Sequence, residues 1–505
     1  MYDVIIIGAG VGGLSCGAKL AMNGKKTMII EKIHHVGGTS HVFRRGDYIF
    51  PMGPLSFSYP ELVKELLKRM GIKEEIKFKR NHFQLISPEI DIIYSEKLNK
   101  LKEKLKNIYK NEEQGIKSFF NELYRIIECI RNIHEWHPDF LIGRARLEAK
   151  KRLKDHEQEF DLINKYNELS SKKLLNEYLK NDILKRLLGS QGTYQPMMNM
   201  VHLAFMWNVM SEEGIWFPSC GIHGINQLLH DSFLKNGGEL KLNSPIKEIL
   251  IDEDQVYGVE TLNGQKYEAE WVVANADYKK VFLELIPPSK LPKNHVENVK
   301  NTAYTGSEFC VYLGFDPEKV NLSKMRANHL FYRKRIDLLK ATDPEDFENK
   351  EIEICLWSNK SSEFAPKNKK SLILRVNMPY DHFDVWRTGE KQRKEGYKDY
   401  KKSLALKLIK TVECIFPGLN SSIEIMEIAT PLTYRDWGQR YLGSVAGWTR
   451  DIKKIRLNTK LLLEKPIKHL LMVGIYSVLE PFLGGYPVSM YTGNLAADLI
   501  LEQKQ

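Results

Sequence analysis

The stretch DVIIIGAGVGGLSCGAKLAMNGKKTMIIEKIHHVGG, residues 3–38, decides the fold. A short β-branched run from Val4 to Ile7 ends at a glycine, as a buried parallel strand does. The next residues match G-x-G-x-x-G, and a second strand from Thr27 to Ile30 ends at Glu31. This order predicts a strand, a tight turn, a helix and a strand, the unit that binds a dinucleotide.

Each glycine of this turn has its own expected role. Gly8 permits the turn, Gly10 lets a diphosphate approach the backbone, and Gly13 lets the helix pack on the strand. Gly17, one turn later, keeps the helix close to the sheet. The helix N-terminus offers N–H groups to an anion. The residues expected to bind the cofactor here are Gly8, Ala9, Gly10, Val11, Gly12 and Gly13.

Glu31 follows the glycine turn at the spacing that lets a carboxylate accept hydrogen bonds from both hydroxyls of a ribose. An acid at this position disfavours a 2′-phosphate, so NADP is not expected in this pocket. Lys32, the next residue, is expected to line the same site.

The residues after Glu31 indicate whether the expected dinucleotide is FAD or NAD. Five residues lead to Gly37, Gly38 and Thr39. This E-x5-G-G-[RTS] ending resembles the FAD-binding fold of the glutathione-reductase and amine-oxidase type, in which the glycine pair and the next residue wrap the diphosphate. Residues 44–54, RRGDYIFPMGP, resemble a segment of flavin amine oxidases and carotenoid desaturases. That resemblance implies that Gly53, followed by Pro54, lies close to the flavin ring.

Length and composition leave room for two or three soluble domains. The chain has 505 residues, is 43% hydrophobic and carries a net charge of +11. A basic balance can indicate nucleic acid or anionic lipid, but no zinc finger, RNA-binding aromatic motif or basic heptad region is present. Nucleic acid is therefore not an expected partner.

The six cysteines are scattered, and no two have C-x-x-C spacing, so neither a metal site nor a redox dithiol is expected. All six are interpreted as buried thiols in a reducing compartment. The nucleotide fold begins at once, without a secretory signal, and no run of about 18 apolar residues exists. We expect a cytoplasmic protein that does not span a membrane but can lie on its inner face.

The region between the first strands and residue 214 has three parts. Residues 80–95 predict a β-hairpin, and residues 95–188 predict charged helices with apolar stripes. These helices form either a cap with a solvated face or a surface that rests on anionic lipid and admits a lipid substrate. Residues 189–214 are rich in methionine and aromatic residues, which suits either a core or the wall of an adaptable apolar tunnel.

A second informative block covers residues 217–277 and ends in VVANAD. It resembles the return to the FAD domain in the family of phytoene desaturases, carotenoid isomerases and retinol saturases. The resemblance implies that Ile246 offers its backbone to adenine and that Ala274 and Asn275 pass near the nucleotide.

The remaining blocks match the same family. Residues 300–430 contain mixed strands, which the family uses as the floor of the substrate site, and residues 429–448 resemble its return to the flavin domain. In the last block a strand ends at Gly474 and a helix begins near Val488, with its N-terminus expected to face the flavin. Two departures are the interruption at Phe482-Leu483 and Thr492 in place of serine. The expected cofactor contacts here are Gly474, Ile475, Gly485, Tyr486, Pro487 and Val488.

The resemblance covers nearly the whole chain and implies an α/β fold with a Rossmann-like FAD-binding domain, a mixed-sheet substrate domain and a helical cap. The expected FAD segments are residues 1–75, 214–299 and 441–505. Residues 76–213 form the helical cap and part of the substrate domain, and residues 300–440 form the mixed-sheet substrate domain.

The implied activity is FAD-dependent desaturation or saturation of carbon–carbon bonds in an isoprenoid or polyene lipid. Three alternatives stay open: redox-neutral carotenoid cis–trans isomerisation, oxidation of a small amine, and a non-enzymatic prenyl-binding carrier. Glu480, Tyr434 and Tyr486 are weak candidates for a proton relay, although a structural role suits each of them. With a single dinucleotide fingerprint, electrons are expected to pass to or from a separate carrier such as a quinone, a ferredoxin or another flavin.

Overall fold

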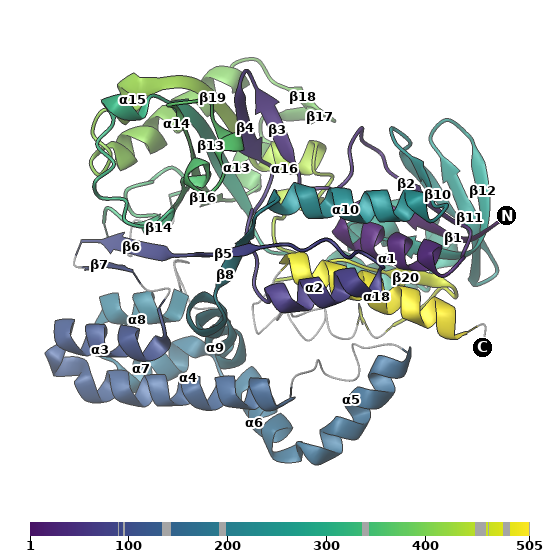
Figure 1. Ribbon diagram of the computed structural model, residues 1–505, viewed down its shortest axis with the longest axis horizontal. Helices are drawn as coiled ribbons and strands as arrows, with labels where there is room; N and C mark the ends of the chain where they lie inside the picture. The colour runs from purple at the N-terminus through teal and green to yellow at the C-terminus, as the bar shows by residue number, and fades with distance from the viewer. Residues whose placement is uncertain are drawn as a thin grey trace.

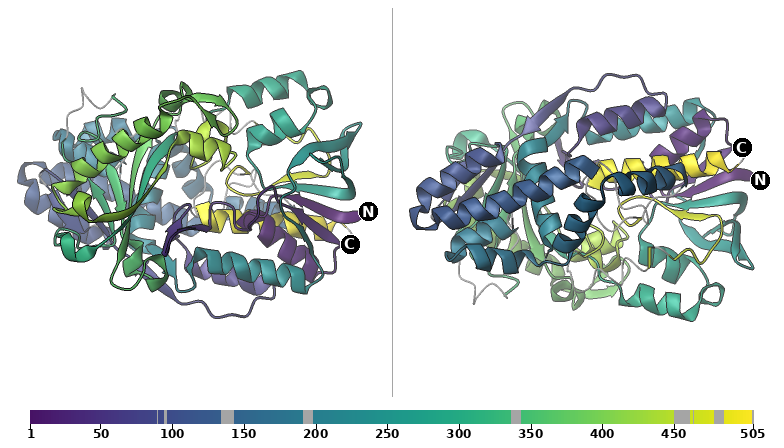
Figure 2. Two further views of the ribbon diagram at one scale, coloured as in Figure 1. Left: turned by 90° about the horizontal axis from the view of Figure 1, so that it is seen from above. Right: turned by 90° about the horizontal axis from the view of Figure 1, so that it is seen from below.

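The computed structural model describes residues 1–503 apart from 89, 94–95, 134–142, 191–197, 336–342, 450–460, 463 and 478–484. The described elements form two lobes (Figure 1). One lobe contains the glycine-rich strands and both chain ends, and the other contains a second sheet and the cap helices. The two views of Figure 2 show the same division from above and below.

The sheet of the first lobe has a parallel core in the order β9-β2-β1-β12-β20. Its strands come from three distant parts of the chain: β1 (Tyr2–Ile7), β2 (Thr27–Ile30), β9 (Glu239–Lys241), β12 (Lys266–Ala274) and β20 (Leu470–Met472). Two antiparallel strands, β10 (Ile246–Asp252) and β11 (Gln255–Thr261), extend it beyond the first part of β12. This is the strand order of a nucleotide-binding α/β fold.

Alternate residues of β1 enter two cores, because successive side chains of a strand point to opposite faces. Val4 and Ile6 pack under four helices, whereas Ile5 and Ile7 face a second core on the other side. The four helices are α1 (Val11–Met22), α2 (Pro60–Arg69), α10 (Gly221–Lys235) and α18 (Gly485–Glu502). The second face is covered by α11 (Tyr278–Lys280), the turn that follows it and α12 (Lys293–Asn301).

The second lobe contains a seven-stranded sheet in the order β19-β13-β16-β15-β14-β6-β7. Its strands are β6 (Phe83–Ser87), β7 (Ile90–Ile93), β13 (Ser307–Phe315), β14 (His329–Tyr332), β15 (Ile352–Cys355), β16 (Lys370–Met378) and β19 (Ile423–Ala429). All neighbours are antiparallel except β6 and β14. The predicted hairpin at residues 80–95 is confirmed as β6–β7, and it completes this mixed sheet.

One face of the second sheet is an ordinary apolar core, which α13 (Asp381–Asp384), α14 (Tyr397–Glu413) and α15 (Leu419–Ser422) help to close. The opposite face meets the hairpin of β3 (Val42–Arg45) and β4 (Tyr48–Pro51), the strand β8 (Ile215–Pro218) and α16 (Pro431–Asp436). Two small pairings complete the strands: β5 (Phe78–Asn81) with β8, and β17 (Arg387–Gly389) with β18 (Gln392–Arg393).

The helical cap consists of α3 (Leu98–Ile108), α4 (Glu113–Ile133), α5 (Gly143–Asp155), α6 (Glu157–Asn167), α7 (Ser171–Tyr178), α8 (Asp182–Ser190) and α9 (Met200–Asn208). The prediction of charged helices is confirmed. Met200 and Trp207 of α9 are fully buried in the core of this cap, and Trp207 donates to the oxygen of Leu188 at 2.8 Å. These described residues of the methionine-rich stretch therefore serve as core.

Two details differ from expectation. Cys220 and Cys414 are exposed, so the prediction of six buried thiols is wrong for these two: one caps α10 and the other follows the last turn of α14. The last helix begins at Gly485 and not near Val488, because Pro487 is tolerated in a first turn, where its missing N–H is not needed.

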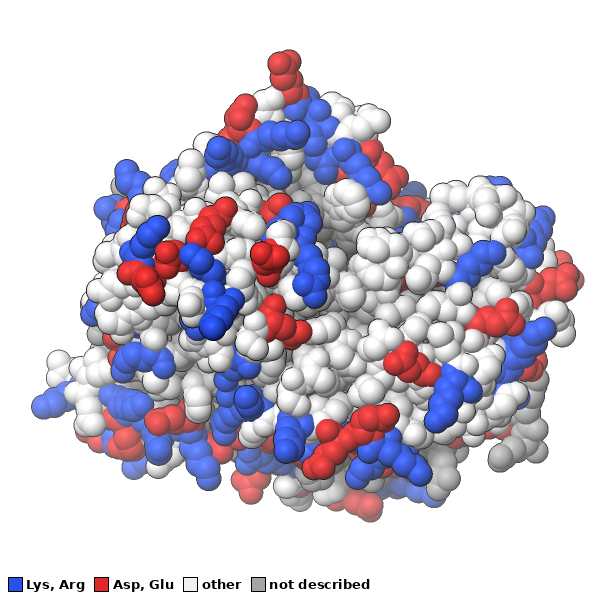
Figure 3. Space-filling model, turned by 45° about the horizontal axis from the view of Figure 1, so that its top comes forward, with Lys and Arg blue, Asp and Glu red and all other residues white. Residues whose placement is uncertain are grey.

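Charge is spread over the surface. Basic and acidic side chains are interspersed over the face shown in Figure 3. Within the described residues no helix combines the length and the apolar character needed to cross a membrane.

Candidate functional site: a dinucleotide cradle

The turn after β1 requires glycine at the first and the last glycine of the G-x-G-x-x-G pattern, Gly8 and Gly13. Gly8 has a φ of +96°, and a Cβ on it would lie 2.6 Å from the backbone oxygen of Asn275. A Cβ on Gly13 would lie 2.1 Å from the oxygen of Gly8. Gly17 has the predicted role, since its Cβ would lie 2.8 Å from Cδ1 of Ile29 on β2. The N-terminus of α1 is therefore held against the carboxyl ends of the strands.

Glu31 directly follows β2 and is 5% exposed. Its Oε2 accepts the N–H of Ala9 at 2.7 Å, and its Oε1 accepts the N–H of Ile33 at 3.1 Å. These two donors fix the carboxylate beside the glycine turn, and each oxygen keeps a further lone pair. A fixed pair of acceptors at this place suits the two hydroxyls of a ribose.

The second glycine pair closes over the first turn. Gly37 donates its N–H to the oxygen of Ala9 at 2.8 Å and pairs with Gly10 in a parallel bridge. Gly37 and Gly38 have φ values of +93° and +57°, which favour glycine. The Asn226 amide on α10 donates to the oxygen of Ser40 at 2.6 Å and so ties this segment to the helix layer.

Arg440 lies beside the second glycine pair, and two further cations, Lys32 and Lys280, lie near Arg440. Arg440 donates from Nη2 to the Thr39 hydroxyl at 2.9 Å, and from Nη1 to the oxygens of Ser444 and Val445. Burial lowers the pKa of Lys32 to about 8; nearby Lys280 and Arg440 lower it too, whereas Glu31 opposes them. Positive charge close to the backbone of a glycine pair is suited to binding a diphosphate.

Asn275, directly after β12, lies at the centre of the cradle. Its N–H donates to the oxygen of Ile7 at 2.9 Å, and its side chain is the nearest neighbour of the Cβ positions of Gly10, Gly12 and Gly474. When the Asn275 amide is oriented so that its oxygen and its nitrogen both have hydrogen-bond partners, Oδ1 accepts the N–H groups of Gly10 at 3.2 Å and Gly13 at 3.3 Å. Asn275 thus contacts both the turn that follows β1 and the turn that follows β20.

The predicted departure at Thr492 has a structural explanation. Its hydroxyl accepts the N–H of Gly474 at 2.9 Å and donates to the oxygen of Ser489 at 3.0 Å. The threonine therefore connects the end of β20 to α18, as a serine hydroxyl also could.

Tyr486 is buried in the first turn of α18. Its hydroxyl donates to Oδ1 of Asn226 at 2.9 Å, and its ring stacks on Phe57 with a centroid distance of 5.0 Å. Burial raises the pKa of Tyr486 well above its usual range. These contacts attach α18 to α10.

The other predicted cofactor residues lie around the same cradle. A Cβ on Gly53 would lie 2.9 Å from the oxygen of Thr39, so the loop after β4 rests on the second glycine segment, with Pro54 exposed beside it. Ile246 begins β10 two residues after Ser244, whose N–H binds the oxygen of Glu31 at 2.9 Å. Three more are buried at the end of β12 and in the first turn of α18: Ala274, Pro487 and Val488.

Ile475 follows Gly474, and its Cγ2 lies 3.8 Å from the Cβ position of Gly485, which is exposed at the start of α18. Val11 and Gly12 are buried in the first turn of α1. Glu480 lies outside the described residues. Sequence reasoning missed Asn226, Lys280 and Arg440, which reach the cradle only through the tertiary fold.

A charged cluster lies on the strands of the second sheet, next to the buried aromatic cluster that meets the β3–β4 hairpin. Arg375 of β16 donates from Nη2 to Oε1 of Glu308 at 2.9 Å and lies 3.1 Å from Oε2 of Glu353. His329 of β14 places Nε2 2.6 Å from Oε1 of Glu353. Burial alone would raise the pKa of Glu353, but Arg375 and His329 hold it at about 2, so this carboxylate is ionised.

Aromatic side chains surround this polar group. Tyr312 of β13 contacts Phe43 and Phe50 of the β3–β4 hairpin at centroid distances of 5.2 and 5.7 Å. On the other side Trp357 stacks on Phe217 at 6.0 Å. The charged cluster therefore lies beside a buried and well-packed aromatic cluster.

Tyr434 of α16 contacts the second sheet. Its hydroxyl lies 2.9 Å from Sγ of Cys310 on β13, and burial raises its pKa well above the usual range. Six residues further along, Arg440 contacts Thr39. The Tyr434 hydroxyl is thus engaged by a thiol, and the segment that follows it reaches the second glycine pair.

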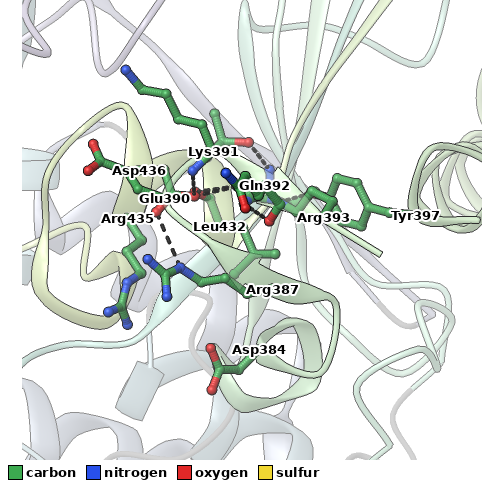
Figure 4. Close-up of polar contacts among 12 residues, drawn as sticks. Asp384, Arg387, Glu390, Lys391, Gln392, Arg393, Tyr397, Leu432, Arg435 and Asp436 are labelled. Carbon is green, nitrogen blue, oxygen red and sulfur yellow. Dashed lines mark hydrogen bonds and ion pairs between the residues drawn. The ribbon is translucent and has the colours of Figure 1, made fainter. Parts of the chain in front are cut away.

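The short helix that carries Tyr434 is fixed by a buried acid at its end. Asp436 is 2% exposed and lies 2.7 Å from Nη2 of Arg393 and 3.4 Å from Nε of Arg387 (Figure 4). It also accepts the N–H of Lys391 at 3.0 Å. The β17–β18 hairpin therefore holds α16, and with it Tyr434, against the second sheet.

The cradle fits one ligand class well: a dinucleotide with a ribose at Glu31 and a diphosphate between two glycine turns. The turn geometry, the acid and the cations agree with this class, which is that of FAD-binding proteins.

Comparisons with known proteins give the family. Residues 11–403 match the family described as flavin containing amine oxidoreductase, so the chain belongs to that family. It is an FAD-dependent oxidoreductase, and the predictions of FAD, of an enzyme and of the α/β fold are confirmed.

Two relatives and one solved structure illustrate the range. The chain is 24% identical to the chloroplastic prolycopene isomerase of Arabidopsis thaliana over 100% of this chain and 84% of that protein. It is 24% identical to the 1-hydroxycarotenoid 3,4-desaturase of Flavobacterium sp. (strain P99-3) over 99% of both chains. A putrescine oxidase triple mutant shares the fold, with a TM-score of 0.65, 13% identity and 99% coverage of both chains.

Proposed function

We propose that this protein uses FAD to remove or add hydrogen at carbon–carbon bonds of a carotenoid-like polyene. The proposal rests on the alignment of nearly the whole chain with relatives whose names refer to carotenoids. One of them is a desaturase, and the alignment covers 99% of its length.

The residues of this chain would hold FAD in a defined way. Glu31 would bind the ribose, the two glycine turns and Arg440 the diphosphate, and the segment from Gly53 and the start of α18 would flank the ring. When bound, FAD supplies a two-electron acceptor or donor for hydride. The protein then contributes the positioning of the substrate against FAD.

Product analysis tests this function. The FAD-loaded enzyme is incubated with a polyene that contains both saturated and conjugated segments, and the absorption spectrum and mass of the product are measured. A mass change of two hydrogens per step, with gained or lost conjugation, is expected. An isobaric product with a shifted spectrum would identify an isomerase instead, and turnover of amines without polyene conversion would contradict the proposal.

We further propose that a separate carrier, such as a quinone, a ferredoxin or another flavin, exchanges electrons with the enzyme. The support is the single dinucleotide fingerprint of the sequence, which FAD occupies. Anaerobic mixing with each carrier and with NADPH ranks them by the rate of flavin absorbance change. Reduction by NADPH alone at the turnover rate would contradict this view.

A further inference from the structure

Three side chains that can bind a metal ion converge on one face of the second sheet. His329 of β14 stands directly opposite Cys355 of β15, and Glu353 precedes Cys355 by two residues on the same strand. Alternate residues of a strand share a face, and so do residues that pair across two strands. The ligand atoms of the three side chains lie within 4.8 Å of one another. Strand register thus brings together a nitrogen, an oxygen and a sulfur ligand.

Oε1 of Glu353 lies between the other two ligand atoms. It is 2.6 Å from Nε2 of His329 and 3.8 Å from Sγ of Cys355. A tetrahedral ion with ordinary zinc bond lengths would separate these two pairs of atoms by about 3.4 Å and about 3.6 Å. A shift of less than about 1 Å at the histidine, which a small side-chain rotation provides, would therefore admit the ion.

The imidazole of His329 is buried without the partners that a buried polar group usually has. The residue is 8% exposed, and its ring packs against Phe83 with a centroid distance of 4.6 Å. Within the described part of the chain, neither ring nitrogen makes a hydrogen bond, although Nε2 is close to Glu353. An unpaired polar group in the core lowers stability, and a role as a metal ligand explains why it is present.

The neighbouring charges are compatible with a divalent cation. Glu353 directs Oε2, and not Oε1, toward Arg375 at 3.1 Å, and Arg375 also donates to Glu308 at 2.9 Å. Glu308 therefore balances the guanidinium, while the Glu353 carboxylate and a thiolate at Cys355 would balance the two charges of the ion. Arg375 would act on the ion only through Glu353, whose orientation it fixes, as outer partners of metal ligands commonly do.

The three ligand types favour zinc over the alkaline-earth ions. Mg²⁺ and Ca²⁺ bind oxygen ligands, whereas thiolate, imidazole and carboxylate are the ligands of Zn²⁺ in proteins. Three protein ligands leave the fourth tetrahedral position to water. Water can reach the cluster, because the side chains of His329 and Glu353 are 10% and 20% accessible.

We propose that His329, Glu353 and Cys355 form a binding site for a divalent transition-metal ion, with Zn²⁺ as the expected occupant. The ion would join β14 to β15 in the second lobe, apart from the dinucleotide cradle. This inference goes beyond the proposed function and does not depend on it. A local spacing such as C-x-x-C could not reveal the site, because its ligands come from two strands.

Zinc binding is measured on the full-length, FAD-loaded protein. The protein is dialysed against a chelator and titrated with ZnCl₂ by calorimetry, and its zinc content is determined by mass spectrometry after gel filtration. We expect one zinc ion per chain and a higher temperature of unfolding with zinc, because the ion binds the folded state. Cys355→Ser and His329→Gln should each weaken zinc binding by more than about 100-fold, since each removes a direct ligand.

Co²⁺ in place of zinc reports the ligands directly. A tetrahedral Co²⁺ site has visible absorption bands at longer wavelengths than oxidised flavin absorbs, so the titration can be followed with FAD bound. The wild type should show these bands. Cys355→Ser, which nearly keeps the size of the side chain but offers no thiolate, should lose them while its FAD content stays normal. This variant keeps the test decisive if His329→Gln does not fold.

The other cysteines provide matched controls. Cys129→Ser removes a buried thiol in the cap, and Cys220→Ser/Cys414→Ser removes the two exposed thiols, which are the most available for adventitious zinc. These variants should bind zinc as the wild type does. The inference would be overturned by zinc binding that Cys355→Ser leaves unchanged, by loss of zinc from the exposed-thiol variant alone, or by a wild type that binds no stoichiometric zinc.

Discussion

Arg440 is the residue that ties the re-entry segment after α16 to the second glycine pair. Its Nη2 donates to Thr39, which is 401 residues away in the sequence. Lys32 and Lys280 add positive charge nearby. An arginine directly after the glycine pair would be able to approach the diphosphate. Here Thr39 stands at that position and accepts a hydrogen bond from Arg440, which supplies the positive charge from another segment of the chain.

This arrangement predicts a selective loss of diphosphate binding. Arg440→Gln should weaken binding of ADP to the apoprotein by about 1.5–3 kcal/mol, because a charge-assisted hydrogen bond is lost, and leave adenosine binding unchanged. Isothermal titration of both ligands measures the difference. Equal weakening of ADP and adenosine would show that Arg440 supports the loop rather than the diphosphate.

Two control variants sharpen this comparison. Glu31→Gln should weaken ADP and adenosine alike, because both contain the ribose that Glu31 is expected to bind. Arg45→Gln removes an exposed arginine that pairs with Glu427 at 2.7 Å, so it should change neither affinity. Unaltered adenosine binding in Glu31→Gln would contradict the ribose assignment.

Residues with local partners could be predicted from the sequence. Glu31 and the glycines act within one strand–turn–helix–strand unit, so spacing alone identifies them. Asn226 and Arg440 could not be identified in this way, since Asn226 reaches Ser40 across 186 residues and Arg440 crosses 401. The Glu308–Arg375 pair was missed for the same reason: it depends on the register of β13 against β16.

At the scale of elements, the crossing of α1 and α18 positions the cradle. A Cβ on Gly493 would lie 2.2 Å from the oxygen of Gly12, so the two helices touch through backbone atoms. Ser15 donates to the oxygen of Met490 at 2.9 Å, and Asn494 donates to the Ser15 hydroxyl at 2.9 Å. This close contact holds the first turn of α1 against the middle of α18.

Gly493→Ala should force these helices apart. We expect the free energy of unfolding of the apoprotein to fall by about 1–3 kcal/mol, the usual cost of overpacking, together with weaker FAD binding. Urea denaturation and flavin titration measure the two effects. Gly485→Ala, on the same helix, would meet only Cγ2 of Ile475 at 3.8 Å and should leave stability within about 1 kcal/mol. Equal effects of the two substitutions would contradict the packing argument.

The elements themselves were largely predictable, but their partners were not. Alternation in residues 80–95 indicated the β6–β7 hairpin, yet nothing local indicated that β6 pairs in parallel with β14. Strand pairing between segments this far apart depends on the tertiary fold, which a short sequence pattern does not contain.

At the scale of the whole molecule, the cap is the part that can meet a lipid surface. Lys100 and Lys104 of α3 pair with Glu96, and Lys106 pairs with Glu103, so much of its charge is locally balanced. On α5, Leu147 is 64% exposed beside exposed Lys150 and Lys151. An apolar side chain among lysines is the composition of an interfacial helix.

We therefore propose peripheral contact with an anionic membrane through α5. A water-insoluble polyene would be collected from the bilayer, and the basic helix would hold the cap there. Anionic lipid attracts each nearby lysine by about 1 kcal/mol at low salt, so the attachment should weaken as salt rises.

Liposome flotation tests this contact with vesicles that contain either anionic or only zwitterionic lipid. The FAD-loaded protein should float with anionic vesicles at low salt and remain in solution with zwitterionic ones. Lys150→Glu/Lys151→Glu should reduce flotation at least about tenfold, because two attractions of about 1 kcal/mol become repulsions. Lys398→Glu/Lys402→Glu on the exposed face of α14 changes the net charge equally and should have a smaller effect. Equal loss in both variants would indicate a response to net charge alone, and absence of flotation with anionic vesicles would contradict membrane contact.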